Sequence, residues 1–214
     1  MYLKYIFILI LVLFITITLI IPFIWCINPA LLTNLKYETV SKLKIEDFEE
    51  PCLFICNHDR DQFLNDQMIA CTEATKTKLK LNIISHNKES DIFTRTLKKL
   101  PLFPKYNLLY TQNNLVEKCK EISKKEHLWM FLFNNDNIKT GAYYITKDTN
   151  TKIVLVKIKK EDNRIIKSFK GIKNFYNLLA NRKFSIEYQL LENKNCEDPK
   201  LFMKNIYNKL YGSS

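Results

Sequence analysis

The chain has 214 residues and a formal charge of +11, from 33 lysines and arginines against 22 acidic residues. This length predicts one domain with a short appendage. Its three glycines, Gly141, Gly171 and Gly212, lie too far apart for a P-loop or a dinucleotide-binding glycine motif, because both need closely spaced glycines around a phosphate. Collagen-like and disulfide-scaffold classes are excluded by the composition as well.

The amino-terminal segment is the most apolar part of the chain. Twenty of the 23 residues in 5–27 are apolar, and no charge occurs between Lys4 and Lys36. As a helix, this segment would be roughly 35 Å long, enough to cross a hydrocarbon core of about 30 Å. A cleaved signal peptide is the alternative, but the sequence around Trp25 offers no small-residue cleavage site. Residues 1–27 are therefore predicted to be a retained single-pass membrane anchor.

The flanking charges predict the orientation of this anchor. Lys36, Lys42 and Lys44 follow it, and the positive-inside bias then leaves residues 28–214 in the cytosol, on an endoplasmic-reticulum-type membrane if the source is eukaryotic or viral. The six cysteines form no compact framework, in agreement with a reducing compartment.

The cationic excess belongs to the part of the chain after the anchor. Removing residues 1–27 removes one lysine and no acid, which leaves +10. An anionic bilayer surface would attract this charge, although simple solubility explains it too. Nucleic acid is not expected as a partner, because only four residues are arginine and no basic cluster occurs.

Short apolar runs and amphipathic stretches alternate along the rest of the chain. In order, strands are predicted at 52–56, 81–85, 108–111, 128–133, 152–159 and 184–191, and helices at 62–73, 89–99, 114–124, 143–149, 173–180 and 199–211. This alternation predicts an α/β fold with a mixed, largely parallel sheet flanked by helices. The predicted division is an anchor at 1–27, a juxtamembrane connector at 28–49 and the α/β domain at 50–214.

A histidine follows the first predicted strand of the domain. Asn57 and His58 end an apolar run, an acidic turn follows, and Asp66 lies on the next predicted helix. The carboxyl ends of strands are where α/β sheets place their chemistry. A neutral imidazole can remove a hydroxyl proton if a carboxylate holds its tautomer. Taken alone, the Asn-His pair is more typical of an ordinary loop histidine, and only its context favours a catalytic one.

Four segments in order resemble the sequence blocks of the lysophosphatidate/glycerolipid acyltransferase family. Asn57-His58 with Asp66 resembles its Asn-His-x-x-x-x-Asp block. Residues 87–112 resemble the second block, 129–136 with Gly141 the third, and 149–158 the fourth, a threonine followed by an apolar strand. The resemblance extends over roughly residues 40–211 and implies the α/β fold of that family.

Several positions depart from the family pattern. Phe63 stands five residues after the histidine, where the family has aspartate, so Asp66 completes the block only with a three-residue insertion. Asp61 is the competing carboxylate, or else the cap of the following helix. The third block lacks its proline, glutamate and glycine, the fourth lacks its proline, and the second-block arginine falls near Thr111 or Gln112.

The resemblance implies transfer of an acyl chain from acyl-CoA to a hydroxyl of a lysophospholipid or glycerolipid. His58 would be the general base, and Asp66, or alternatively Asp61, would orient it. Acyl-CoA would be a co-substrate and membrane lipid the acceptor, with no metal or bound cofactor. The substrate-binding residues implied by matching positions are Asn57, Lys88, Gln112, Asn135, Asp136 and Gly141.

Two other readings remain open beside this one. The altered third block also fits a catalytically degenerate relative that binds lipid or acts as a scaffold at the membrane. Cys52, Cys56, His58 and Cys71 could be drawn as a zinc site, but no second ligand pair has a recognised spacing. Buried small apolar residues are the favoured interpretation of these cysteines.

Overall fold

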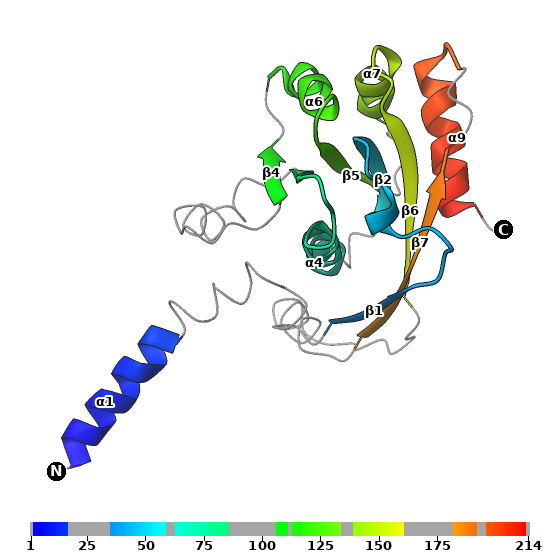
Figure 1. The fold of residues 1–214 in the computed structure, drawn as a ribbon. Helices are drawn as coiled ribbons and strands as arrows, with labels where there is room; N and C mark the ends of the chain where they lie inside the picture. The colour runs from blue at the N-terminus through cyan, green and yellow to red at the C-terminus, as the bar shows by residue number, and fades with distance from the viewer. Residues whose placement is uncertain are drawn as a thin grey trace.

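One mixed sheet with helices on both faces organises the domain (Figure 1). The computed structural model describes residues 2–16, 35–58, 63–85, 106–110, 113–133, 139–160, 182–191 and 196–212. The strands are β1 Leu35–Thr39, β2 Cys52–His58, β3 Leu81–Ser85, β4 Tyr106–Tyr110, β5 His127–Phe133, β6 Lys152–Lys160 and β7 Arg182–Leu190. The helices are α1 Tyr2–Ile15, the 3₁₀ turn η2 Ile45–Asp47, α4 Phe63–Ala74, α6 Leu115–Ser123, α7 Gly141–Lys147 and α9 Pro199–Tyr211.

The predicted α/β class is confirmed, and so is the largely parallel sheet. All six predicted strands are present within a few residues of their expected bounds. The helices predicted at 89–99 and 173–180 lie outside the described residues. The structure adds β1, which pairs with β7, and buries Ile45 of η2 in the core. Residues 35–47, predicted to belong to the connector, therefore contribute to the fold.

The strand order is β1-β7-β6-β2-β5-β3-β4. The five strands from β6 to β4 are mutually parallel, β7 runs antiparallel to β6, and β1 runs parallel to β7. The chain leaves neighbouring strands β2 and β5 toward opposite faces of the sheet, through α4 on one face and α7 on the other (Figure 1). Such a divergence of connections is where α/β sheets open a crevice at the carboxyl ends of their strands.

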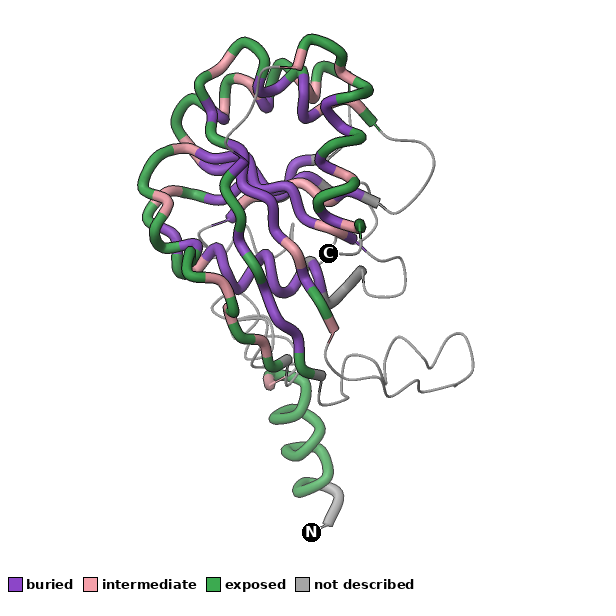
Figure 2. The backbone as a smooth tube through the Cα atoms, turned by 90° about the vertical axis from the view of Figure 1, so that its right-hand side faces the viewer, coloured by how far each residue is buried: buried purple, intermediate pink, exposed green. Residues whose placement is uncertain are grey.

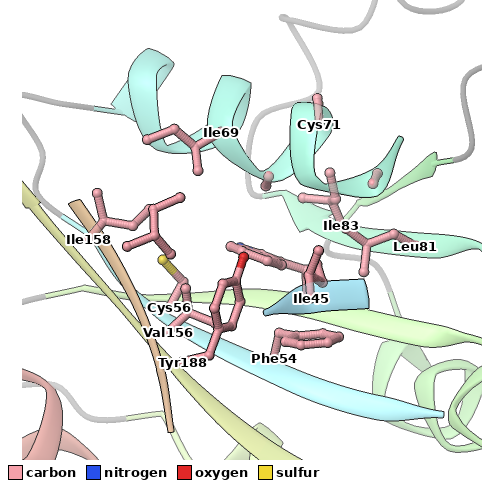
Figure 3. Close-up of a cluster of buried hydrophobic side chains, with 14 of the residues drawn as sticks. Ile45, Phe54, Cys56, Ile69, Cys71, Leu81, Ile83, Val156, Ile158 and Tyr188 are labelled. Carbon is pink, nitrogen blue, oxygen red and sulfur yellow. The ribbon is translucent and has the colours of Figure 1, made fainter. Parts of the chain in front are cut away.

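Two apolar layers fill the space between the sheet and its helices. Phe54 and Cys56 point to the face covered by α4, whereas Leu53 and Ile55 point to the face covered by α6, α7 and α9. Figure 3 shows Ile69 of α4 above the sheet on the first of these faces. Buried segments accordingly run along the middle of the domain (Figure 2). Because β2 is covered on both faces, its first five residues, Cys52 to Cys56, are an unbroken apolar run rather than an alternating one.

The apolar amino-terminal helix differs from every other helix in its exposure. Each residue from Tyr5 to Ile15 of α1 is between 44 and 69% exposed. Among the described residues, no helix has both the length and the apolar character needed to cross a membrane. The predicted span 5–27 continues past α1, which has 14 residues, and its residues 17–27 are outside the described part of the chain.

Candidate functional site

The centre of the candidate site is a buried histidine–carboxylate pair. His58 is the last residue of β2, and its Nδ1 lies 2.7 Å from Oδ2 of Asp66 on α4. Both side chains are almost completely buried, at 1 and 2% exposure. A hydrogen bond from Nδ1–H to the carboxylate fixes the imidazole tautomer that carries its lone pair on Nε2. The pair therefore has the arrangement needed for a proton-accepting histidine.

The local sequence explains why Asp66 reaches the histidine. The β2 strand ends at His58, and α4 begins only at Phe63, so Asp66 falls in the first turn of the helix. The positive end of the helix dipole favours a carboxylate at that position. An aspartate five residues after the histidine would stand at position 63, about one turn before Asp66. Phe63, which stands at the family's aspartate position, begins α4 instead. The alternative carboxylate Asp61 lies outside the described residues.

A tyrosine from the opposite face of the sheet holds the backbone of the histidine. The Oη of Tyr211, the last residue of α9, accepts a hydrogen bond from the His58 N–H at 2.8 Å. The same hydroxyl is a donor to the backbone carbonyl of Leu132 on β5 and lies 3.1 Å from the carbonyl of His58. This one hydroxyl thus bridges β2 and β5 at the point where their connections diverge.

Asn57 secures the other side of the same strand end. Its Nδ2 donates to the carbonyl of Ile158 at 2.9 Å, and its Oδ1 accepts from the N–H of Ile158 at 2.6 Å. The side-chain amide therefore binds the backbone of β6 just beyond the last backbone pair of the two strands, Cys56 with Val156. The structure assigns Asn57 this positional contact, and its expected contact with substrate stays a prediction.

The surroundings of the histidine are apolar. The ring of Phe131 lies 5.0 Å from the imidazole, centroid to centroid. Burial, and secondarily the charge of Asp66, hold the pKa of the neighbouring Cys56 thiol well above its usual value. This thiol is therefore protonated at neutral pH and is a poor nucleophile. Within the described ranges, no three His, Cys, Asp or Glu residues are placed to hold a metal ion.

A second buried carboxylate lies two turns along the same helix. Glu73 is 1% exposed, accepts a 2.6 Å hydrogen bond from Oη of Tyr188 on β7, and forms a 2.6 Å ion pair with Lys76. Burial raises the pKa of Tyr37 on β1 and the charge of Glu73 raises it further, which places that tyrosine in the same cluster. These contacts tie α4 to the β1–β7 side of the sheet.

The structure places the predicted site residues unevenly. It brings together His58 and Asp66 and holds Asn57 beside them. Gly141 begins α7, on the face opposite α4, and an added Cβ there would meet nothing within 4 Å. The other predicted substrate-binding residues, which lie outside the described residues, are Lys88, Gln112, Asn135 and Asp136.

Sequence reasoning missed Tyr211. The only signal in the sequence is a tyrosine just before Gly212, and this resembles an ordinary end of an amphipathic helix. Its contact with His58 joins residues 153 positions apart, which local patterns do not reveal.

The fold and the site together define an α/β protein with a buried histidine–carboxylate pair at the carboxyl edge of its sheet. No protein-family model matches the chain, and no curated protein matches it.

Proposed function

We propose that the protein is a membrane-anchored O-acyltransferase that moves an acyl chain from acyl-CoA to a hydroxyl of a lysophospholipid or glycerolipid. The observation that carries this proposal is the 2.7 Å contact between His58 Nδ1 and Asp66 at the end of the central strand β2. The resemblance of four ordered sequence blocks to the glycerolipid acyltransferases supplies the reaction class.

The proposed reaction needs only proton transfer and acyl transfer. Nε2 of His58 removes the proton from the acceptor hydroxyl while Asp66 stabilises the resulting imidazolium. The acceptor oxygen attacks the thioester carbonyl carbon, and a tetrahedral intermediate forms. Collapse of this intermediate breaks the C–S bond and leaves an ester, while the CoA sulfur takes the proton back from His58. Atoms and electrons balance without a metal or an oxidant.

The setting of the histidine supports the role of a base. A carboxylate that accepts a hydrogen bond from one ring nitrogen orients the imidazole for proton transfer at the other. The His58 side chain is fully buried, and Asp66 lies against its Nδ1. Tyr211 and Asn57 hold the strand end from two sides, so the imidazole is presented from a strand end that these two side chains fix in place.

The membrane setting of the proposal rests on the amino-terminal segment. A helix that is apolar on all sides is stable only where apolar material surrounds it. The α1 helix has this character, since its apolar side chains are exposed all along its length. A bilayer would cover these side chains, and it would also hold an acceptor lipid and its product.

The test is turnover of the full chain, purified in detergent, with an acyl-CoA and a panel of lysophospholipids. His58→Ala is expected to lower kcat/KM on the order of 10²–10⁴-fold, the range that general-base catalysis supplies. His58→Gln keeps more of the buried volume and should lose as much activity, so a folding defect in the alanine variant does not decide the result. Circular dichroism checks that each variant is folded. Full activity in a folded glutamine variant would contradict the mechanism.

A catalytically degenerate lipid-binding relative is the second candidate. The sequence Asn134-Asn135-Asp136, which stands in place of the family's Pro-Glu-Gly, favours it. A lipid-binding relative of this kind should bind a lysophospholipid, which calorimetry measures, but should not consume acyl-CoA. Turnover that is lost in His58→Gln would exclude this candidate.

A further inference from the structure

The catalytic edge of the sheet is also where the chain enters the domain from its apolar helix. Since β6 is parallel to β2, both strands end at the same edge. The β7 strand is antiparallel to β6, and β1 is parallel to β7, so β1 and β7 begin at that edge. The first described residue of β1, Leu35, therefore lies at the same edge of the sheet as His58.

This edge carries lysines that extend beyond the level of His58. Lys160 ends β6, and Lys36 and Lys183 face each other near the starts of β1 and β7. Ile158, whose backbone binds the Asn57 side chain, marks the level of the β2 end on β6. Lys160 lies two residues beyond it toward the carboxyl edge. Lys183 is three residues further out by register, which is about 10 Å at roughly 3.3 Å per residue.

Lysines with and without an ion pair occur at both ends of the strands. At the amino edge, where the parallel strands β6 to β4 begin, Lys152 pairs with Glu50 at 2.6 Å and Lys124 with Glu121 at 2.8 Å, while Lys80 and Lys125 form no ion pair with another described residue. At the carboxyl edge, Lys159 is 4.0 Å from Glu187.

Lys36, Lys160 and Lys183, together called the edge lysines, form no ion pair with any other described residue. Lys36 and Lys183 are exposed and Lys160 is partly exposed. Along β1, the acid nearest to Lys36 is Glu38, which is two residues further from the carboxyl edge. Among the described residues, the outermost positions of β1, β6 and β7 at this edge therefore include three lysines that no described acid pairs with.

We infer that the edge lysines dock the carboxyl edge of the sheet on an anionic bilayer surface and so turn His58 toward the lipid. This inference rests on the proposed function for its membrane, and it adds the face of the domain that contacts the headgroups. Each lysine held near an anionic surface strengthens the association by about fivefold. An apolar helix restrains the distance of the domain from the bilayer but not its rotation, which the attraction of the edge lysines to the anionic headgroups would set.

The test measures which face is covered, and it requires no catalysis. The full chain is reconstituted in vesicles of phosphatidylcholine alone or with about one third phosphatidylserine, well within the anionic range that attracts basic segments. A membrane-impermeant acetylating reagent labels the lysines, and mass spectrometry gives the labelling rate at each. Lys80, Lys118 and Lys125, which are exposed on the opposite edge and on α6, are the internal controls.

The expected result is that the edge lysines are labelled about fivefold or more slowly in the anionic vesicles than in the phosphatidylcholine vesicles. High salt should remove this protection, because it screens charges over a few ångströms. If the anionic lipid slowed the labelling of the edge lysines no more than that of the control lysines, the docking surface would be overturned, whether or not the protein turns over acyl-CoA.

Charge reversal provides the matched comparison. The triple change Lys36→Glu, Lys160→Glu and Lys183→Glu should abolish the protection of the neighbouring Lys159. The control triple change Lys80→Glu, Lys118→Glu and Lys125→Glu alters the net charge equally and should leave that protection intact. Turnover in detergent should be the same for both triple variants if the edge lysines only dock. Loss of detergent activity in the edge variant alone would instead make these lysines part of the reaction site and overturn the inference.

Discussion

The two edges of the sheet each contain a buried histidine, and the partners of the two imidazoles differ. His58 ends β2 and contacts the carboxylate of Asp66. His127 begins the neighbouring strand β5 at the other edge, where its Nδ1 accepts the Cys52 N–H at 3.2 Å. Their exposures are 1 and 0%, so burial does not distinguish them. What distinguishes them is the partner of Nδ1, which is a carboxylate at His58 and a backbone N–H at His127.

The environment of His127 keeps its ring neutral. Burial lowers the pKa of His127 to about 4, because the charged form loses its hydration there. Asn82 donates a hydrogen bond to the carbonyl of His127 at 3.1 Å and one to the Glu126 carboxylate at 2.7 Å, which anchors the amino edge. The amino edge is thus built for stability, while the carboxyl edge presents a histidine with a carboxylate. The following experiments test this contrast.

Amide substitutions at the two buried carboxylates of α4 should affect different properties: one should lower kcat and the other should lower stability. Asp66→Asn removes the group that stabilises an imidazolium at His58, and we expect kcat to fall on the order of 10²–10⁴-fold. Glu73→Gln makes the same chemical change two turns away, in the cluster with Tyr188 and Lys76. It should cost about 1–3 kcal/mol of stability and leave kcat unchanged.

Steady-state kinetics and urea denaturation of both variants measure this comparison. If Glu73→Gln lowered kcat as much as Asp66→Asn, the two carboxylates would not have separate roles and the contrast would fail.

Much of this contrast could be predicted from the sequence. The apolar run of β2 and the following histidine indicate a strand end, and an acid on the next helix indicates its partner. The sequence favours Asp66 but leaves Asp61 as an alternative, because the number of residues in a turn does not determine where the helix starts. Placing α4 at Phe63 pairs His58 with Asp66.

Two further features escaped sequence reasoning for physical reasons. The β1 strand has five residues and alternating charge, and it is held by pairing with β7 rather than by an apolar pattern of its own. The neutrality of His127 depends on burial contributed by distant segments, including Phe54, whose ring lies 5.3 Å from the imidazole. Both depend on tertiary contacts, which no local pattern encodes.

Acid should destabilise the amino edge through His127. Between pH 6.5 and pH 4 the unfolded chain binds a proton at this histidine that the folded chain, with its pKa of about 4, does not bind. Stability therefore falls as the pH falls through this window, by up to about 3 kcal/mol from this group. His127→Asn offers an acceptor to the Cys52 N–H without titrating.

Denaturation of both proteins at pH 7 and pH 4.5 gives the pH-dependent difference. The loss of stability on acidification should be smaller in the asparagine variant. An identical loss in both would mean that His127 takes up no proton on unfolding in this range.

The smallest expected effect concerns how firmly the carboxyl edge is held. Tyr211→Phe keeps the packing of α9 and removes only the hydroxyl that bridges His58 and Leu132. It should cost about 0.5–1.5 kcal/mol of stability, the value of a typical hydrogen bond. Since Tyr211 acts through His58, kcat should fall while KM stays constant. Tyr143→Phe, which removes a 2.8 Å hydrogen bond to the Glu197 carbonyl far along the chain, should cost similar stability without changing kcat.

A double variant separates positioning of the histidine from a general weakening of the fold. In a His58→Gln background, Tyr211→Phe should reduce the residual activity no further, because residues that act as a unit are strongly non-additive. An additional reduction equal to that in the unmodified protein would mean that the hydroxyl acts independently of the imidazole. The carboxyl edge would then depend on Tyr211 for stability alone, as the amino edge depends on Asn82.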